Sequence, residues 1–150
     1  ADTNGRIVIQ MAEQFVAKRD NAVLADSLGT KVYFSLMRQA VAMVGNSSSG
    51  IIEAASFELP VVNLGARQQG RAQSGNVINV AEERSAITRA ITRAASEHFR
   101  SALAGTKNVY GDGHAADRIV SRLSTMEISE SLIMTQFNDL SLARTSRGAA

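Results

Sequence analysis

Residues 41–58 restrict the choice of fold more sharply than any other segment of the chain. An apolar run at 41–44 ends at Gly45-Asn46, three serines and Gly50 follow, and an amphipathic stretch comes next. This order is typical of a buried strand, a tight polar turn and the N-terminus of a helix. The segment therefore predicts one strand–turn–helix unit of an α/β protein.

The chemistry of this serine turn, Ser47-Ser48-Ser49, predicts an anion-binding site. Backbone N–H groups and the positive end of a helix dipole face an anion in such a turn, and the three hydroxyls add donors. Serines at a helix start are most often simple caps, but three in succession exceed what capping requires. Glu53 follows one turn later, where its carboxylate suits sugar hydroxyls better than phosphate. The turn therefore indicates a nucleotide.

Apolar periodicity along the chain alternates between strand and helix. A parallel sheet with helices on both faces follows from such alternation, so we predict a Rossmann-like α/β fold. The last residues give weaker signals, with one more helix expected at 131–140 and disorder at 141–150. Helices are expected at 6–18, 31–40, 50–58, 82–95 and 114–123, and strands at 41–44, 61–64 and 77–80, with a weaker candidate at 21–25.

A second polar loop, residues 65–71, follows the strand expected at 61–64. It carries Arg67, Arg71 and two glutamines. Guanidinium groups bind oxyanions through paired hydrogen bonds, and ligands of open α/β sheets bind at the carboxyl ends of the strands. An isolated arginine pair would indicate only surface charge. Its place at the same sheet edge as the serine turn favours one shared site.

Composition excludes several other classes of function. The 150 residues form one domain, and a net charge of +2 from scattered basic residues gives no indication of nucleic acid binding. The absence of cysteine excludes disulfides and thiolate metal sites, and it fits a reducing compartment. No apolar run approaches the roughly 20 residues that span a membrane. Two distant histidines without a carboxylate cluster predict no metal site, and no cofactor is expected.

Three motifs, in order, resemble the C-terminal domain of the UDP-N-acetylglucosamine 2-epimerases: 45–53, 60–71 and Tyr110-Gly111-Asp112-Gly113. Asn-Ser-Ser and Arg-Gln-x-Gly-Arg are similar to the hydrolysing branch, which serves sialic acid and related capsule sugar synthesis. The resemblance covers about residues 2–123. It implies the second domain of a GT-B-like enzyme, in which two Rossmann-like domains face each other across a cleft. The domain's first strand and the N-terminal domain would then be missing, as in a piece cut from a longer chain.

The resemblance also assigns roles to individual residues in UDP binding. Ala55 and Val109 depart from the family pattern, and neither belongs to the serine turn. Tyr33 follows closely behind the position that meets uracil. The implied UDP-binding set is Leu28 at the uracil, Ser47 and Ser48 at the diphosphate with Ser49 extending the turn, Glu53 at the ribose, and Arg67 beside the nucleotide.

The reaction that the resemblance implies is elimination of UDP across C1–C2, followed by addition of water. The family's acid and base carboxylates lie in the N-terminal domain, so no catalytic residue is assigned here and the isolated chain is expected to be inactive. The expected function is the UDP-sugar-binding half of a hydrolysing epimerase that converts UDP-N-acetylglucosamine and water to N-acetylmannosamine and UDP.

Two alternatives stay open. The chain could be a stand-alone sugar-nucleotide-binding or glycosyltransferase-like module that works with a separate catalytic chain, or a degenerate fragment without a site. We expect a UDP-binding domain at 1–124 and a C-terminal extension at 125–150. The expected partners are a UDP-sugar, the missing N-terminal domain and, in the full-length form, further copies of the protein. Neither nucleic acid nor membrane is expected, and the predicted location is cytoplasmic.

Overall fold

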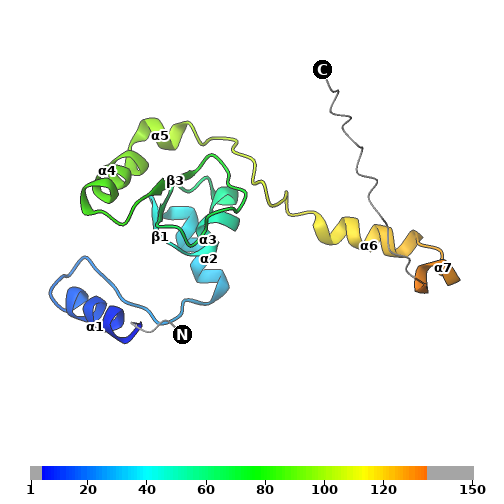
Figure 1. The fold of residues 1–150 in the computed structure, drawn as a ribbon, viewed down its shortest axis with the longest axis horizontal. Coiled ribbons are helices and arrows are strands. Elements are labelled where there is room, and N and C mark those ends of the chain that lie inside the picture. The colour runs from blue at the N-terminus through cyan, green and yellow to red at the C-terminus, as the bar shows by residue number, and fades with distance from the viewer. Residues whose placement is uncertain (1–4, 135–150) are drawn as a thin grey trace, which may run out of the picture. The chain divides into compact units, whose positions relative to one another are not determined.

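The computed structural model describes residues 5–134, which fall into two compact units that divide between Asp112 and Gly113 (Figure 1). The first unit holds a parallel sheet and its helices. Its strands are β1 (Met43–Gly45), β2 (Val61–Leu64) and β3 (Val77–Val80). Its helices are α1 (Gly5–Val16), α2 (Gly29–Gln39), α3 (Ser48–Ile52), the 3-10 helix η1 (Ala54–Phe57), α4 (Arg84–Ala95) and α5 (Glu97–Ser101).

The sheet has the order β1-β2-β3, and both pairs of neighbouring strands are parallel. Its register aligns Met43 with Val61 and Val61 with Val77. Strands β2 and β3 match the predicted ranges residue for residue, because Pro60 and Gly65 bound the first and Asn76 precedes the second. The predicted α/β parallel sheet is confirmed.

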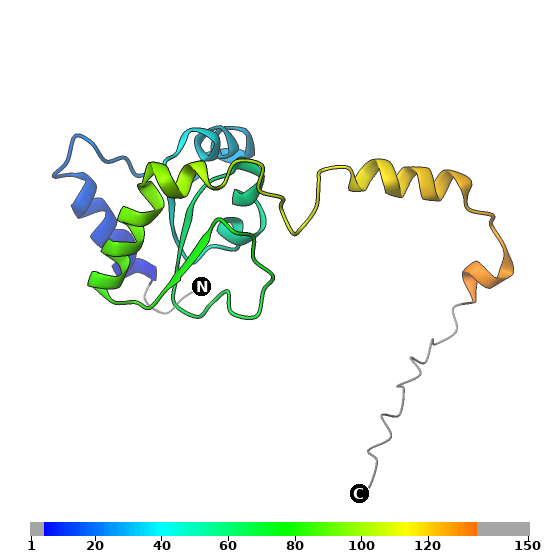
Figure 2. The same ribbon diagram turned by 90° about the horizontal axis from the view of Figure 1, so that it is seen from above.

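Helices cover both faces of the sheet, as the alternation predicted (Figures 1 and 2). Since successive side chains of a strand point to opposite faces, Val61 and Val62 belong to different cores. One core packs strands against α2 and η1: Met37, Ala54, Leu59 and Val61, with Tyr33, Phe34, Met43, Phe57 and Val77 beside them. The other packs strands against α4: Val62, Ala90 and Ala94, with Ala42, Leu64, Ile78 and Val80 beside them.

The single helix expected at 50–58 is wrong in its form. A five-residue α3 is followed by the 3-10 helix η1, and Glu58 then adopts a left-handed backbone conformation with φ of 52°. The side chain of Asn108 donates to the Ile52 carbonyl at 2.7 Å and to Ser56 Oγ at 2.8 Å. Asn108 therefore stabilises the end of α3. Because Asn108 lies more than 50 residues further along the chain, the apolar period of 50–58 gave no indication of this contact.

The strand expected at 21–25 is also wrong, because this segment is irregular in the structure. Val23 is 89% exposed and Leu24 is nearly half exposed. A strand needs a neighbour to pair with, and the described sheet contains only β1, β2 and β3. Helix α5 is a further difference, since the periodicity gave no signal for it; Ser96 caps it by accepting from the Phe99 N–H at 3.3 Å.

The second unit contains α6 (Ala115–Thr125) and α7 (Glu130–Ile133). Helix α6 agrees with the helix expected at 114–123, and α7 covers the start of the one expected at 131–140. Residues 135–150 lie outside the described residues, so the remainder of the helix expected at 131–140 and the disorder expected at 141–150 are untested. The boundary expected at 124/125 stays a prediction. None of the helices between residues 5 and 134 combines the length and the apolar character that a membrane span needs.

Candidate functional site

The serine turn connects β1 to α3 at the carboxyl end of the sheet. Ser47 is the N-cap of α3, and its Oγ accepts from the Ser49 N–H at 3.3 Å. Tyr33 Oη donates to Ser49 Oγ at 2.8 Å. Ser48 is exposed, and its hydroxyl and backbone N–H have no protein partner within residues 5–134. Capping therefore accounts for Ser47, while Ser48 keeps both donors available for a ligand.

A cavity of about 550 Å³ opens beside this turn. We call it the serine pocket; it brings together segments that are far apart in the sequence, the loop before α2, the first turn of α2 and the α3 region. Leu28, Ser47, Ser49 and Glu53 all line it, so four of the six predicted UDP-binding residues meet in one cavity. The full lining is Ala25, Asp26, Ser27, Leu28, Gly29, Thr30, Tyr33, Phe34, Ser47, Ser49 and Glu53.

The other two predicted residues do not line the serine pocket. Ser48 lies in the same turn with an exposed side chain, and Arg67 is exposed in the loop after β2. Because α3 has only five residues, its dipole is that of little more than one turn. An anion at this turn would therefore depend on the nearby N–H groups, hydroxyls and Arg67 more than on a long helix.

Gln68 holds the arginine loop against the serine turn. Its side chain is only 3% exposed although both neighbouring side chains are exposed, and its Nε2 donates to the Asn46 carbonyl at 2.8 Å. The two predicted loops are thus joined directly. Gln68 is buried and Gln69 is exposed, and nothing in the sequence distinguishes these two adjacent glutamines of the loop.

Gly50 has a structural role in the packing of α3. A Cβ atom built at Gly50 would lie 2.9 Å from Val61 Cγ1 and 3.6 Å from the Met43 sulfur. Such a contact with Val61 is shorter than side-chain packing allows. The glycine therefore lets α3 pack closely on β1 and β2, which fixes the serine turn above the strand ends.

The turn at Tyr110 holds the long loop between β2 and β3. Tyr110 Oη donates to the Ala72 carbonyl at 2.9 Å, and the Val109 N–H donates to Ser74 Oγ at 3.1 Å. Asn76, which precedes β3, is fully buried and donates from Nδ2 to the Leu59 carbonyl at 2.8 Å. These contacts stabilise the backbone on which the arginine loop is built.

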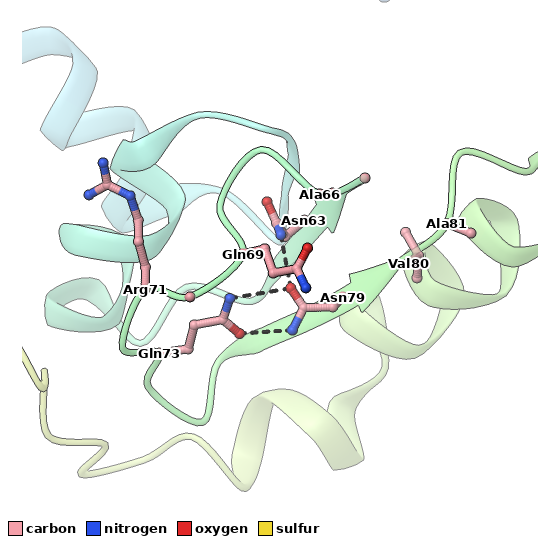
Figure 3. Close-up of a pocket in the computed structure, with 10 residues that line it drawn as sticks. Asn63, Ala66, Gln69, Arg71, Gln73, Asn79, Val80 and Ala81 are labelled. Carbon is pink, nitrogen blue, oxygen red and sulfur yellow. Dashed lines mark hydrogen bonds between the residues drawn. The ribbon is translucent and has the colours of Figure 1, made fainter.

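A second cavity, of about 670 Å³, lies at the carboxyl ends of β2 and β3 (Figure 3). Asn63 Nδ2 donates to Asn79 Oδ1 at 2.8 Å, and Asn79 Nδ2 donates to Gln73 Oε1 at 2.8 Å. This pair was not among the predicted site residues, although the sequence carries a signal for it: an asparagine is the third residue of both apolar runs, Val-Val-Asn-Leu and Val-Ile-Asn-Val.

The described residues offer binding groups more readily than catalytic ones. Between residues 5 and 134 no group of three or more His, Asp or Glu side chains is placed to hold a metal ion. The serine pocket supplies hydroxyl donors and the Glu53 carboxylate, and the adjoining loop supplies arginine. Hydroxyl, N–H and guanidinium groups suit an oxyanion, and a carboxylate suits hydroxyl groups.

A parallel sheet with polar loops gathered at its carboxyl edge defines a Rossmann-like ligand-binding domain. The sequence model of one family, UDP-N-acetylglucosamine 2-epimerase, matches residues 1–124. The chain belongs to this family, as the three motifs indicated.

Curated relatives include members of the hydrolysing type. The chain is 39% identical over 101 residues to a GDP/UDP-N,N'-diacetylbacillosamine 2-epimerase (hydrolyzing) of Campylobacter jejuni, covering 67% of this chain and 26% of that protein. It is 32% identical over 133 residues to the UDP-N,N'-diacetylbacillosamine 2-epimerase (hydrolyzing) of Legionella pneumophila, covering 89% and 34%. It is 30% identical over 146 residues to polysialic acid biosynthesis protein P7 of Escherichia coli, covering 97% and 37%. The chain thus spans about a third of the length of these relatives.

Proposed function

We propose that this chain is the UDP-sugar-binding half of a hydrolysing UDP-N-acetylglucosamine 2-epimerase. The whole enzyme would convert UDP-N-acetylglucosamine and water to N-acetylmannosamine and UDP. The observation that carries the proposal is the serine pocket, in which Leu28, Ser47, Ser49 and Glu53 share one cavity. Family membership and the hydrolysing relatives support the choice of ligand.

UDP would lie along the carboxyl edge of the sheet. Uracil would meet the backbone near Leu28, and the ribose hydroxyls would donate to the Glu53 carboxylate. The diphosphate would accept hydrogen bonds from Ser47 and Ser48, with Ser49 extending the turn. The position of Ser48 supports this arrangement, since its two donors have no protein partner within the described residues.

Arg67 would neutralise the diphosphate from the neighbouring loop. Its guanidinium is exposed, and the Gln68–Asn46 hydrogen bond keeps its loop beside the serine turn. An arginine can bind two phosphate oxygens at once and stays protonated at any physiological pH, so it would bind the diphosphate without acting as a base.

Catalysis would need groups beyond those assigned here to UDP binding. Elimination requires a base to remove the C2 proton and an acid to assist the departure of UDP. Glu53 would be engaged by ribose and Arg67 by phosphate. We therefore expect the isolated chain to release no UDP from UDP-N-acetylglucosamine. In the proposed complete enzyme, an N-terminal domain faces this one across a GT-B-like cleft. We expect that enzyme to assemble from several copies and to be located in the cytoplasm.

Titration calorimetry on the 150-residue chain tests the proposal. UDP should bind with a free energy of about 4 to 5 kcal/mol, a millimolar to high micromolar dissociation constant, because these 150 residues span only about a third of the length of the relatives. Uridine should bind much more weakly. Arg67→Ala should weaken UDP binding by about 1.5 to 3 kcal/mol, since it removes a charged hydrogen-bond partner.

The matched control is Arg38→Ala, which removes an exposed arginine from the last turn of α2 and should leave UDP affinity unchanged. Glu53→Gln separates the ribose role from a general effect on the pocket. It should weaken UDP binding more than pyrophosphate binding. Equal affinities for UDP and uridine would contradict the diphosphate assignment, and equal losses for UDP and pyrophosphate would contradict the ribose assignment.

A further inference from the structure

Glu53 lies where two short helices meet, as the C-cap of α3 and the N-cap of η1. Its N–H donates to the Ser49 carbonyl at 2.9 Å, and its carbonyl accepts from the Ser56 N–H at 3.0 Å. Within residues 5–134 its carboxylate forms no hydrogen bond or ion pair with another group. The direction of the carboxylate in the serine pocket therefore depends on the backbone that carries it.

The side chain of Asn108 holds this backbone from a distant part of the chain. Its Nδ2 donates to the Ile52 carbonyl at 2.7 Å and to Ser56 Oγ at 2.8 Å. The Ile52 carbonyl belongs to the same planar peptide group as the Glu53 N–H. Hydrogen bonds to Asn108 and Ser49 therefore hold the two ends of that peptide group. Through Ser56, Asn108 also contacts the residue that binds the Glu53 carbonyl.

The Asn108 amide is itself fixed in orientation. A side-chain amide has two N–H donors and one oxygen acceptor. Both donors are engaged as described, and Asn108 Oδ1 accepts from the Tyr110 N–H at 2.9 Å. The hydrogen bond from Tyr110 Oη to the Ala72 carbonyl anchors this turn on the loop before β3. Rotation of the amide would break all three of its hydrogen bonds, so Asn108 is a rigid support for the junction of α3 and η1.

Helix capping explains only part of this arrangement. The last carbonyls of a helix have no partner inside the helix, and the hydrogen bond to Ile52 satisfies one of them. Ser56 is exposed, so water could serve its hydroxyl without any contribution from Asn108. The second hydrogen bond therefore exceeds what the end of α3 requires. Its effect is to join the backbone before Glu53 to the backbone after it.

We propose that Asn108 is a positioning residue for the Glu53 carboxylate and thereby sets how strongly the site recognises ribose hydroxyls. This inference rests on the proposed function, because it takes Glu53 as the ribose acceptor. Asn108 does not line the serine pocket, so it acts through Glu53 and not on the ligand. Hydrogen bonds weaken steeply as their geometry departs from the optimum. Loss of the Asn108 donors therefore weakens the ribose contact and leaves the diphosphate donors of the serine turn in place.

The test compares three ligands by NMR titration: UDP, 2′,3′-dideoxyuridine diphosphate and pyrophosphate. The first two carry the same diphosphate and differ only in the ribose hydroxyls. The wild-type chain should bind UDP about five- to tenfold more tightly than the dideoxy analogue, and Glu53→Ala should abolish this preference.

Asn108→Ala should reduce the preference for UDP over the dideoxy analogue to about twofold or less, while pyrophosphate affinity changes by less than about twofold. In a chain that already carries Glu53→Ala, Asn108→Ala should cause no further loss of the preference. Such non-additivity identifies two residues that act through one contact.

Asn108→Asp is the variant of matched shape. It keeps an oxygen that accepts from the Tyr110 N–H and loses both donors, so it should lose the preference as Asn108→Ala does. The control is Asn21→Asp, which adds the same charge at an exposed asparagine outside the lining of the serine pocket. It should keep the wild-type preference.

Retention of the preference by both Asn108 variants, even with a lowered thermal midpoint, would overturn the proposal, since Asn108 would then only stabilise the end of α3. Retention by Asn108→Asp alone would also overturn it, because the donors would not be responsible. Equal losses for UDP and pyrophosphate would show a general loosening of the site and have the same consequence. Absence of any preference in the wild-type chain would instead contradict the ribose assignment of the proposed function, so the two failures are distinguishable.

Discussion

Helices α1 and α4 have similar amphipathic sequences and very different surroundings. Helix α4 buries Ala90 and Ala94 against β2 and β3. Helix α1 buries none of its residues, and Ile7, Met11 and Phe15, spaced to form one apolar stripe, are each more than half exposed. The apolar period therefore predicts that a segment is helical and which side is apolar, but not what covers that side.

The two regions differ in what lies against their apolar side chains. Strands β1 and β3 both pair only with β2, but Ile78 and Val80 of β3 pack in the core beside α4, whereas Val41 and Val44 are more than two-fifths exposed. Segment 21–25 has no strand to pair with in the described sheet. The apolar side chains beside α4 are thus covered, while Val41, Val44 and the apolar stripe of α1 are exposed.

The largest expected effect is on the free energy of unfolding, and it appears when a core side chain and a side chain of α1 are each replaced by alanine. Ile51 is 0% exposed, and Ile51→Ala should lower the free energy of unfolding by about 2 to 5 kcal/mol, since it leaves a cavity. Met11→Ala should change it by less than about 0.5 kcal/mol, because Met11 is 65% exposed. Urea denaturation followed by circular dichroism measures both. Similar losses for the two variants would mean that α1 is packed in solution and would break the comparison.

The sequence predicted the paired strands of the sheet better than the segments and contacts that depend on distant parts of the chain. Strands β2 and β3 were predicted in full. Each is a short apolar run that is flanked by a residue such as Pro60, Gly65 or Asn76, and each has a neighbouring strand to pair with. The strand at 21–25 was wrong because local sequence cannot tell whether a pairing partner exists. At the site, motif resemblance placed Leu28 and Glu53 in one pocket. Burial of Gln68 and pairing of Asn63 with Asn79 depend on contacts between loops and strands, which periodicity does not encode.

Gln68 offers a way to sharpen the comparison, because it joins the loop after the central strand β2 to the turn after the outer strand β1. Gln68→Met removes the hydrogen bond to the Asn46 carbonyl but also removes Oε1, a buried acceptor without a partner within residues 5–134. These effects offset each other, so the thermal midpoint should change little. UDP affinity should fall by about 1 to 1.5 kcal/mol as Arg67 loses its position beside the serine turn.

The control for this variant is Gln39→Met, which replaces an exposed glutamine at the end of α2. It should alter neither the midpoint nor UDP affinity. Calorimetry and a thermal scan on the same preparations measure the two quantities. A large drop in the midpoint of Gln68→Met with unchanged UDP affinity would show that Gln68 supports the core and does not position the arginine loop.

The smallest expected effect concerns Tyr33, which reaches from α2 to the serine turn and so connects the core on the α2 side of the sheet with the site. Tyr33→Phe removes the 2.8 Å hydrogen bond to Ser49 Oγ and leaves the ring in place, so UDP affinity should fall by about 0.5 to 1 kcal/mol. A double-mutant cycle with Ser49→Ala isolates the pair. If Tyr33 acts by holding the Ser49 hydroxyl, the double variant should lose no more affinity than Ser49→Ala alone. Additive losses would mean that Tyr33 contacts the ligand independently, and its hydroxyl would then belong to the binding set.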